Sequence, residues 1–344
     1  MAATPKRLGF FTRLLDQVGP AERYRLALEQ IACAERNGFD SAWVAQHHFT
    51  EGEGGLPSPF VFLSQVAART STIRLGTGVI TLPLENPLRV AEDAAVLDLL
   101  SGGRLEVGVG TGGTATSFAS FGHDSAQRGQ IYAQYLQTVL AAWRGEPIAG
   151  SPNRLYPAAP QLIDRVWQAT FSVEGGRRAG LAGDGLMLSR TQPRPATAPR
   201  ATLAEIQDPI IDAYLSALPA GRAPRILGSR SVFVADDRAE ARHFALLGLR
   251  RFVTYARAAG FTLAGDTLDE LLLASDAHVG TPEEVIASLA ADRTLERVTD
   301  LVVQVHPLDP PHRLILRSIE LVADKVAPAF GWRRPALAAL APAA

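Results

Sequence analysis

Strand-like and helix-like segments alternate along this chain. Short apolar runs rich in β-branched residues predict strands, and longer stretches with apolar residues three or four positions apart predict helices. In the first part of the chain the expected strands are 8–11, 41–45, 73–82 and 105–109, and the expected helices are 21–37, 58–69 and 87–100. The order of strand then helix therefore repeats from the start.

The second part continues this alternation less regularly. The expected strands are 166–170, 185–188, 226–234 and 300–305, and the expected helices are 128–143, 176–182, 204–218, 237–258 and 313–326. About eight strands separated by helices, with no linker between two halves, predict a single (β/α)8 TIM barrel over residues 1–344 rather than two domains. The apolar strands also fit a parallel sheet that is covered on both faces.

Two segments depart from the repeat. Residues 192–204 are rich in Pro, Thr, Ala and Arg with little periodicity, and they follow the sixth strand. We expect residues 192–227 to form an insertion that acts as a lid over the barrel mouth. The Pro- and Ala-rich tail 328–344 is expected to fray.

The composition points to a small ligand. The chain has 34 Lys and Arg against 35 Asp and Glu, a net charge of -1, and its basic residues are scattered. This balance favours neither a nucleic-acid partner nor a membrane surface. Cys33 is the only cysteine, which excludes an internal disulfide and a thiolate metal cage, and we expect it to be buried. With no apolar run of ~20 residues and a first strand unlike a signal peptide, we expect a soluble, cytoplasmic protein.

Two adjacent histidines follow the second expected strand. The run from Trp43 to Thr50 leads from apolar residues into His47 and His48. Imidazole titrates near neutrality, and the carboxyl ends of barrel strands are where such folds build their sites. Consecutive strand residues point to opposite faces, so only one of the pair is expected to enter the mouth, and a structural role stays open. The other histidines show no metal-ligand spacing, although His306 follows the last strand and is placed to reach the mouth.

Three glycine-rich segments also follow strands. Residues 108–113 match G-x-G-x-x-G, but they lead into an apparently irregular stretch, 114–122, instead of the helix that a dinucleotide fold requires. Small residues there, and at 77–81, would let a flat ring or a phosphate approach the backbone, although a glycine bulge in a packed strand remains the alternative at 77–81. Residues 172–178 open a helix and predict an anion site, with simple capping by Ser172 as the alternative.

Several segments together resemble bacterial luciferase and the luciferase-like flavin monooxygenases. The resemblance runs in order across nearly the whole chain. It is carried by residues 37–50, 75–83, 86–93, 97–104, 183–185 and 279–285. It implies a (β/α)8 barrel that binds FMN at the carboxyl ends of its strands and reacts the reduced flavin with oxygen.

The resemblance also assigns residues. His47 matches the catalytic histidine, with His48 beside it, and Gly78 and Val79, next to Thr77, match the pair that supports the isoalloxazine ring through a cis peptide. The remaining matches are Gly110 and Thr111 beside the ring, and Ser172, Gly175 and Gly176 in the phosphate loop. Two positions differ from luciferase: Gln46 stands where luciferase has an acid, and Thr111 replaces an arginine.

The expected function is an FMN-dependent monooxygenase that oxidises a small organic substrate, with His47 as general acid/base. Reduced FMN would come from a separate flavin reductase, because no nicotinamide site is evident, and a homodimer is expected. Three alternatives stay open: a deazaflavin-dependent oxidoreductase of the same fold, a non-catalytic flavin-binding partner subunit, and a metal-dependent barrel hydrolase. The identity of the bound cofactor, flavin-dependent oxygen consumption and a metal assay distinguish them.

Overall fold

The computed structural model describes residues 6–195, 197–198, 200–258 and 265–332. All pairings between its strands are parallel. The strands are β1 (Arg7–Thr12), β2 (Ser41–Val44), β3 (Arg74–Thr77), β4 (Ile80–Thr81), β5 (Leu105–Gly110), β6 (Val166–Ala169), β7 (Gly185–Leu188), β8 (Ile226–Val234), β9 (Ala277–Gly280) and β10 (Asp300–Gln304).

The sheet closes on itself. Its order is β10-β1-β2-β3-β5-β6-β7-β8, and β8 pairs back to β10. The strand β4 continues β3 along β5, and β9 lies outside the ring on the far half of β8. Within the described residues, eight strand positions therefore form a closed cylinder, and the predicted (β/α)8 barrel is confirmed.

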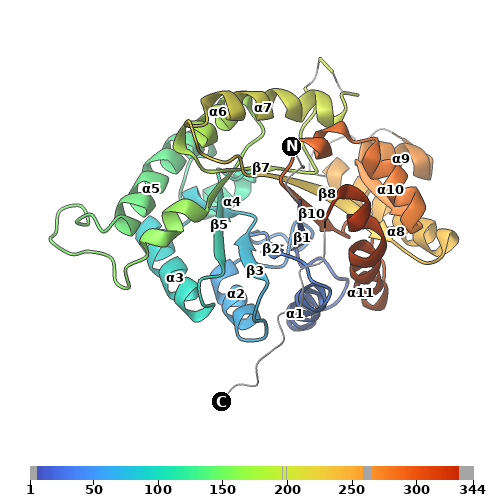
Figure 1. Cartoon of the computed structure of the whole chain (residues 1–344), viewed down its shortest axis with the longest axis horizontal. Helices are drawn as coiled ribbons and strands as arrows, with labels where there is room; N and C mark the ends of the chain where they lie inside the picture. Colours follow the sequence, from blue (N-terminus) through green and yellow to red (C-terminus); the bar gives the residue numbers. More distant parts are fainter. Residues whose placement is uncertain (1–5, 196, 199, 259–264, 333–344) are drawn as a thin grey trace.

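Helices surround the strands (Figure 1). The α-helices are α1 (Pro20–Arg36), α2 (Pro59–Ala67), α3 (Pro87–Leu100), α4 (Ala115–Ser120), α5 (Arg128–Trp143), α6 (Val173–Ala182), α7 (Leu203–Ala217), α8 (Arg238–Ala258), α9 (Leu268–Ala274), α10 (Pro282–Ala290) and α11 (His312–Leu321). Local signals fix several starts: Asn86 Oδ1 accepts the Leu88 N–H at 2.9 Å, with Pro87 opening α3.

Some elements differ from the sequence prediction. The expected irregular stretch 114–122 contains the short helix α4, and the region before the last strand contains α9, β9 and α10, which the pattern did not predict. These elements have four to nine residues, too few for a periodic signal to stand out. The expected strand 73–82 is divided into β3 and β4 at the Gly78–Val79 peptide, which is cis, as the family resemblance implied.

The expected lid is mostly part of the barrel wall. Residues 203–217 form α7, which packs so closely on α6 that a Cβ on Gly176 would lie 2.5 Å from the Ile210 carbonyl oxygen. Residues 226 and 227 already belong to β8. The lid expectation is thereby confined to 192–202, in which 196 and 199 lie outside the described residues.

The first residues of the expected frayed tail belong to the fold, which corrects the prediction for 328–332. Residues 327–330 form a 3-10 helix, and Trp332 is buried, with its indole N–H donating to Asp40 Oδ2 at 2.8 Å. A buried indole with a hydrogen-bond partner ties this segment to the barrel. The rest of the predicted tail, 333–344, lies outside the described residues.

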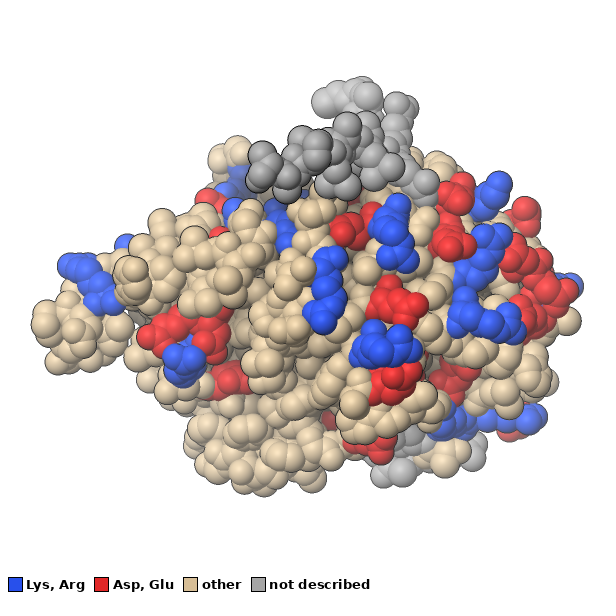
Figure 2. Space-filling view, turned by 90° about the horizontal axis from the view of Figure 1, so that it is seen from below, with Lys and Arg blue, Asp and Glu red and all other residues tan. Residues whose placement is uncertain are grey.

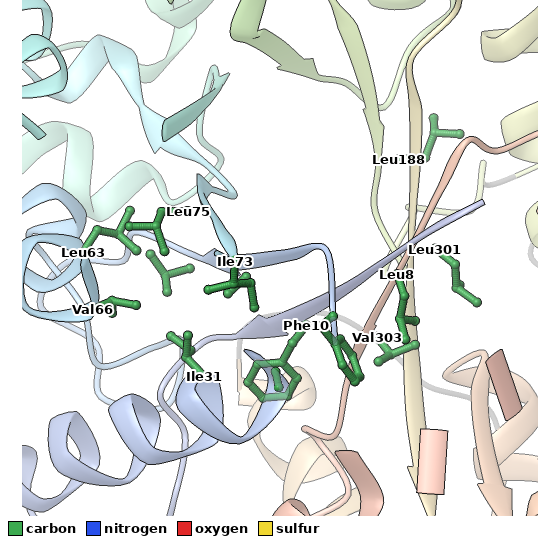
Figure 3. Close-up of a cluster of buried hydrophobic side chains, with 14 of the residues drawn as sticks. Leu8, Phe10, Ile31, Leu63, Val66, Ile73, Leu75, Leu188, Leu301 and Val303 are labelled. Atoms are coloured by element: carbon green, nitrogen blue, oxygen red, sulfur yellow. The ribbon is translucent and has the colours of Figure 1, made fainter. Parts of the chain in front are cut away.

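The larger hydrophobic core lies between the strands and the helices. Figure 3 shows part of it, where Leu8 and Phe10 of β1 lie close to Leu301 and Val303 of β10 and Ile31 of α1 is nearby. Cys33 belongs to this core, as expected, and burial raises the pKa of its thiol. Because strand side chains alternate between the two faces, the strand residues of this core lie on the outer face of the sheet.

A second, smaller core fills the inside of the barrel. Trp43 and Trp167 meet edge to face with ring centroids 5.6 Å apart. Trp43 stands beside Gly76 in the neighbouring strand, and Trp167 beside Gly185. Below them the Arg7–Asp300 and Arg74–Glu106 ion pairs occupy the amino ends of the strands. The interior is therefore packed from the amino ends upward, which leaves the carboxyl ends for a ligand.

The surface charges are largely paired. Arg25 lies between Glu22 and Glu29 on α1, and Arg317 pairs with Asp236 and Glu320. On the face shown in Figure 2, blue and red side chains lie beside one another and neither colour forms one continuous area. Among the described residues, no helix combines the length and apolar character that crossing a membrane requires.

We predict that Gly185→Ala destabilises the protein by about 1–3 kcal/mol, the usual cost of overpacking. The added Cβ would lie 2.2 Å from Trp167 Cε3, inside a core that has no room to relax. Gly129→Ala, at the exposed start of α5 with nothing within 4 Å of the new Cβ, serves as the control and should be neutral or stabilising by up to about 1 kcal/mol. Urea denaturation of both variants measures the difference; equal stabilities would contradict this account of the inner core.

Candidate active site

A cavity of about 540 Å³ opens at the carboxyl ends of the strands. Its size lies in the range that holds a small-molecule ligand or cofactor. Its walls come from the segments that follow β2, β3, β5 and β6, including both histidines and the glycine-rich segments. The structure thus brings together residues more than a hundred positions apart, as the barrel prediction required.

Small residues form one wall of the cavity. Gly78 and Val79, joined by the cis peptide, lie against Gly110: a Cβ on Gly110 would be 2.8 Å from Val79 Cγ2. A Cβ on Gly78 would be 2.8 Å from Phe11 Cε2. Because neither position tolerates a side chain, this wall presents backbone to the cavity, which suits a flat ring.

Gln46 connects this wall to the histidine segment. Its Oε1 accepts the Thr81 N–H at 2.7 Å, and its Nε2 donates to the Pro57 carbonyl at 3.0 Å and to Glu85 Oε1 at 2.5 Å. Burial raises the pKa of Glu85, and the bond from Gln46 partly opposes this rise. The residue that stands in place of the luciferase acid is thus a neutral link between three segments.

His47 is enclosed by positive charge. Its Nε2 lies 3.5 Å from Arg13 Nη2, and its buried Nδ1 has no hydrogen-bond partner among the described residues. Burial first, and then repulsion from Arg13, His48 and Arg190, lowers the pKa of His47 to about 3. The imidazole is therefore neutral at physiological pH when no ligand is bound.

His48 also lines the cavity, which corrects the expectation that only one of the pair reaches the mouth. The expectation assumed an extended strand, but β2 ends at Val44, and side chains beyond it need not alternate. His48 packs edge to face on Phe121 with centroids 4.9 Å apart, and its buried Nε2 has no hydrogen-bond partner among the described residues. Burial lowers the pKa of His48 too.

The opposite end of the cavity carries positive charge. Ser172 caps α6 by accepting the Gly175 N–H at 3.1 Å, so the capping role predicted as an alternative is present. Arg128 and Arg178 also line the cavity, and the Tyr132 ring over which Arg178 lies is one turn beyond Arg128 on α5. Arg178 donates to Gln168 Oε1 at 3.0 Å and lies 5.0 Å from the centre of the Tyr132 ring, which fixes its direction. A helix start with two guanidinium groups nearby suits a phosphate.

The predicted site residues divide into two groups. Gly78, Val79, Gly110, Thr111 and Ser172 line the cavity together with both histidines.

Three predicted cofactor residues lie behind the cavity wall. Thr77 is buried and exchanges hydrogen bonds of 2.8 and 2.9 Å with the backbone of Gly108. Gly175 packs against Thr170, and Gly176 packs under α7. These residues shape the site from behind.

Sequence reasoning missed Arg128 and Arg178, and it placed His306 too near the mouth. Arg178 belongs to the 172–178 segment that was already singled out, so its charge was a usable signal; Arg128, at the start of α5, carried none. His306 is buried beside Asp16, with Nε2 3.7 Å from Oδ2, and it is not part of the cavity wall.

Comparison with known proteins identifies the family. A family model described as luciferase-like monooxygenase matches residues 8–297. The 4-hydroxyprotoasukamycin monooxygenase of Streptomyces nodosus subsp. asukaensis is 31% identical over 331 residues, which cover 88% of this chain and 86% of that protein. The chain therefore belongs to the luciferase-like monooxygenase family, as the motifs indicated, and this family is one of flavin-dependent monooxygenases.

Solved structures share the barrel. The crystal structure of monooxygenase RslO1 from Streptomyces bottropensis has a TM-score of 0.74 and 25% identity, covering 94% of this chain and 99% of that one. The oxygenating constituent of 3,6-diketocamphane monooxygenase from Pseudomonas putida, in complex with FMN, has a TM-score of 0.72 and 20% identity, with 97% and 100% covered. An F420-dependent secondary alcohol dehydrogenase has a TM-score of 0.68 and 18% identity, with 95% and 99% covered. The last two show the fold alone.

We predict that buried histidines make the protein less stable as the pH falls below about 6.5, the ordinary histidine pKa. The pKa of His47 is lowered to about 3 and that of His278 to about 4, mainly by burial, so the unfolded chain binds more protons than the folded one below that pH. The stability that these neutral histidines allow is fully present above the histidine pKa of the unfolded chain. It is lost progressively as the pH falls toward the lower pKa values of the folded chain. The free energy of unfolding of His47→Gln and of His278→Gln, each compared with the wild type at the same pH, should be more favourable to the variant at pH 4.5 than at pH 7.5. Urea denaturation measures this difference, and a difference that does not depend on pH would contradict the lowered pKa.

Proposed function

We propose that the protein is an FMN-dependent monooxygenase that uses reduced FMN and O2 to oxidise a small organic molecule. The observation that carries this proposal is the arrangement of one cavity: a backbone wall at Gly78–Val79 and Gly110, His47 beside it, and Arg128 and Arg178 at the far end. Its wall of small residues matches an isoalloxazine ring, and its arginines match a phosphate. Similarity to the S. nodosus monooxygenase over most of both chains supports oxygen chemistry.

The residues present fit FMN. Gly78, Val79, Gly110 and Thr111 would hold the ring, and the Ser172 segment with Arg128 and Arg178 would hold the phosphate. These two arginines supply the charge that the luciferase arginine would have given at position 111. When bound, reduced FMN supplies the electrons that activate O2, and the protein supplies position and shielding from water.

The histidines would manage protons beside the ring. In the ligand-free site, His47 is neutral and surrounded by cations, so it can accept a hydrogen bond at one ring nitrogen and donate one at the other. An anionic ligand placed near Arg13 would offset the positive charge around His47 and raise the pKa of His47 toward the working pH. In this role His47 acts as general acid/base, and His48, packed on Phe121, closes the adjacent wall.

The remaining parts of the proposal follow from the family. Reduced FMN would be delivered by a separate flavin reductase, and the protein would work as a homodimer in the cytoplasm, as one domain whose lid is residues 192–202. The alternative with specific support is a deazaflavin-dependent oxidoreductase, because an F420-dependent enzyme shares this fold. Oxygen consumption with reduced FMN, set against hydride transfer with reduced F420, decides between the two.

We predict that Arg128→Met weakens FMN binding at least about tenfold, because a charged hydrogen bond to phosphate contributes roughly 1.5–3 kcal/mol. Riboflavin, which lacks the phosphate, should bind the variant and the wild type equally. Arg177→Met is the matched control, since Arg177 pairs with Glu174 on the exposed side of α6. Fluorescence titration measures all affinities, and an equal loss for FMN and riboflavin would exclude a phosphate at this end.

We predict that His47→Ala keeps reduced-FMN affinity within a few-fold but lowers product formation at least ~100-fold, the usual scale of acid–base catalysis. Oxygen would still be consumed and released as hydrogen peroxide. His48→Ala should reduce product formation less, since its partner is an aromatic wall. The assay compares product, oxygen and peroxide; normal turnover by His47→Ala would show that the histidine is structural.

A further inference from the structure

A second group of polar side chains lies next to His47. Arg190 and Gln192 follow β7, and they are 4% and 2% exposed. Arg190 Nη1 is buried without a hydrogen-bond partner among the described residues, and so are both Nε2 and Oε1 of Gln192. Buried polar groups in folded proteins are nearly always satisfied, so three such atoms on two neighbouring residues require an explanation.

Burying the charged Arg190 without a partner destabilises the fold more than burying the neutral Gln192 amide. Burial lowers its pKa to about 9, and repulsion from Arg13 adds to this effect. The acid that partly opposes the shift is Asp276, but Asp276 is already paired with Arg194 at 2.6 and 2.8 Å. Among the described residues no carboxylate is therefore free to neutralise the Arg190 guanidinium, and an isolated buried charge is strongly unfavourable.

No other acid in the described part of the chain pairs with Arg190. The residues outside the described ranges contain neither Asp nor Glu. Among the described residues, Arg190 has no salt bridge. The other buried arginines are satisfied: Arg230 pairs with Asp292, Arg23 pairs with Glu51, and Arg104 donates to the carbonyls of residues 67, 70, 73 and 101. Because the protein retains an arginine here without a carboxylate, the partner of Arg190 is expected to be a ligand.

The surroundings indicate the rest of that ligand. Arg190 follows the carboxyl end of β7, on the same side of the barrel as His47, and its charge contributes to the lowered pKa of His47, so its partner would sit near the proposed reaction centre. Phe11 and Met187 line the interior just below, next to Gly78. Ser231 of β8 and Gln304 of β10 are paired in register, and Ser231 Oγ and Gln304 Oε1 are also buried without partners among the described residues. The region therefore combines an apolar surface with cationic and polar groups.

We propose that Arg190 and Gln192 bind a carboxylate of the substrate, whose apolar body lies against Phe11 and Met187, so that the enzyme oxidises an organic acid. This inference rests on the proposed function for the reaction, but not for the binding. Arg190 is a binding residue for the substrate anion, separate from the flavin phosphate end at Arg128. The carboxylate would neutralise Arg190 beside His47.

The test uses thermal unfolding of the full chain without flavin, at constant ionic strength. With no ligand, Arg190→Met should raise Tm by at least about 2 °C, because it removes an unpaired buried charge. Benzoate should raise the Tm of the wild type in a saturable way, and benzamide, which has the same shape without the charge, should not. Arg190→Met should lose the benzoate response.

Two controls locate the effect. Arg128→Met should keep the benzoate response, which separates this site from the phosphate end, and Arg25→Met, an exposed arginine on α1, should behave like the wild type. A lower Tm for Arg190→Met with an unchanged benzoate response would make Arg190 structural and overturn the inference. Equal responses to benzoate and benzamide, or none in the wild type, would overturn it as well. If Arg190→Met does not fold, the comparison of benzoate with benzamide in the wild type and in Arg190→Gln still decides.

The outcome is independent of the flavin experiments. Failure of FMN binding or of oxygen consumption would remove the proposed function and leave a carboxylate site in place. Failure of the benzoate response would leave the monooxygenase proposal intact and remove only the acidic substrate.

Discussion

Two indole rings in the centre of the barrel determine where a ligand can bind. Trp43 and Trp167 meet edge to face, and each fits only because the neighbouring strand carries a glycine at the same level, Gly76 or Gly185. A T-shaped pair of this kind is favourable and rigid, and it fills the lower half of the cylinder. The space that remains lies at the carboxyl ends, above a floor that cannot move without disturbing both rings.

The site above that floor is dominated by positive charge. Arg128 and Arg178 lie at one end of the cavity, and Arg13 and Arg190 lie near His47, while the pKa of His47 is lowered by its surroundings. The cavity wall also carries an acid, Glu53, which accepts from Thr114 Oγ1, and the excess of arginines favours anionic ligands. Each of the two proposed ligands, a flavin phosphate and a substrate carboxylate, would neutralise arginine charge in a different part of the site.

The sequence predicted the barrel and most of its elements because eight buried strands and their helices give strong periodic signals. It also located the glycine wall and the histidines through motif resemblance. It did not predict α9, β9 or α10, whose signals are short, nor that His48 shares the cavity, because the end of β2 is set by tertiary contacts. The sequence could not predict that Arg190 is buried without a salt bridge among the described residues, since the pairing of Asp276 with Arg194 is a property of the folded chain.

Gln46 has a consequence for how this site can vary between relatives. Its amide donates to Glu85 and accepts from the Thr81 backbone, so one residue needs both a donor and an acceptor. A carboxylate at position 46 would set two acids against each other and lose the donor. Positions 46 and 85 are therefore chemically coupled: an acid at position 46 is compatible with this packing only if position 85 carries a hydrogen-bond donor in place of its own acid.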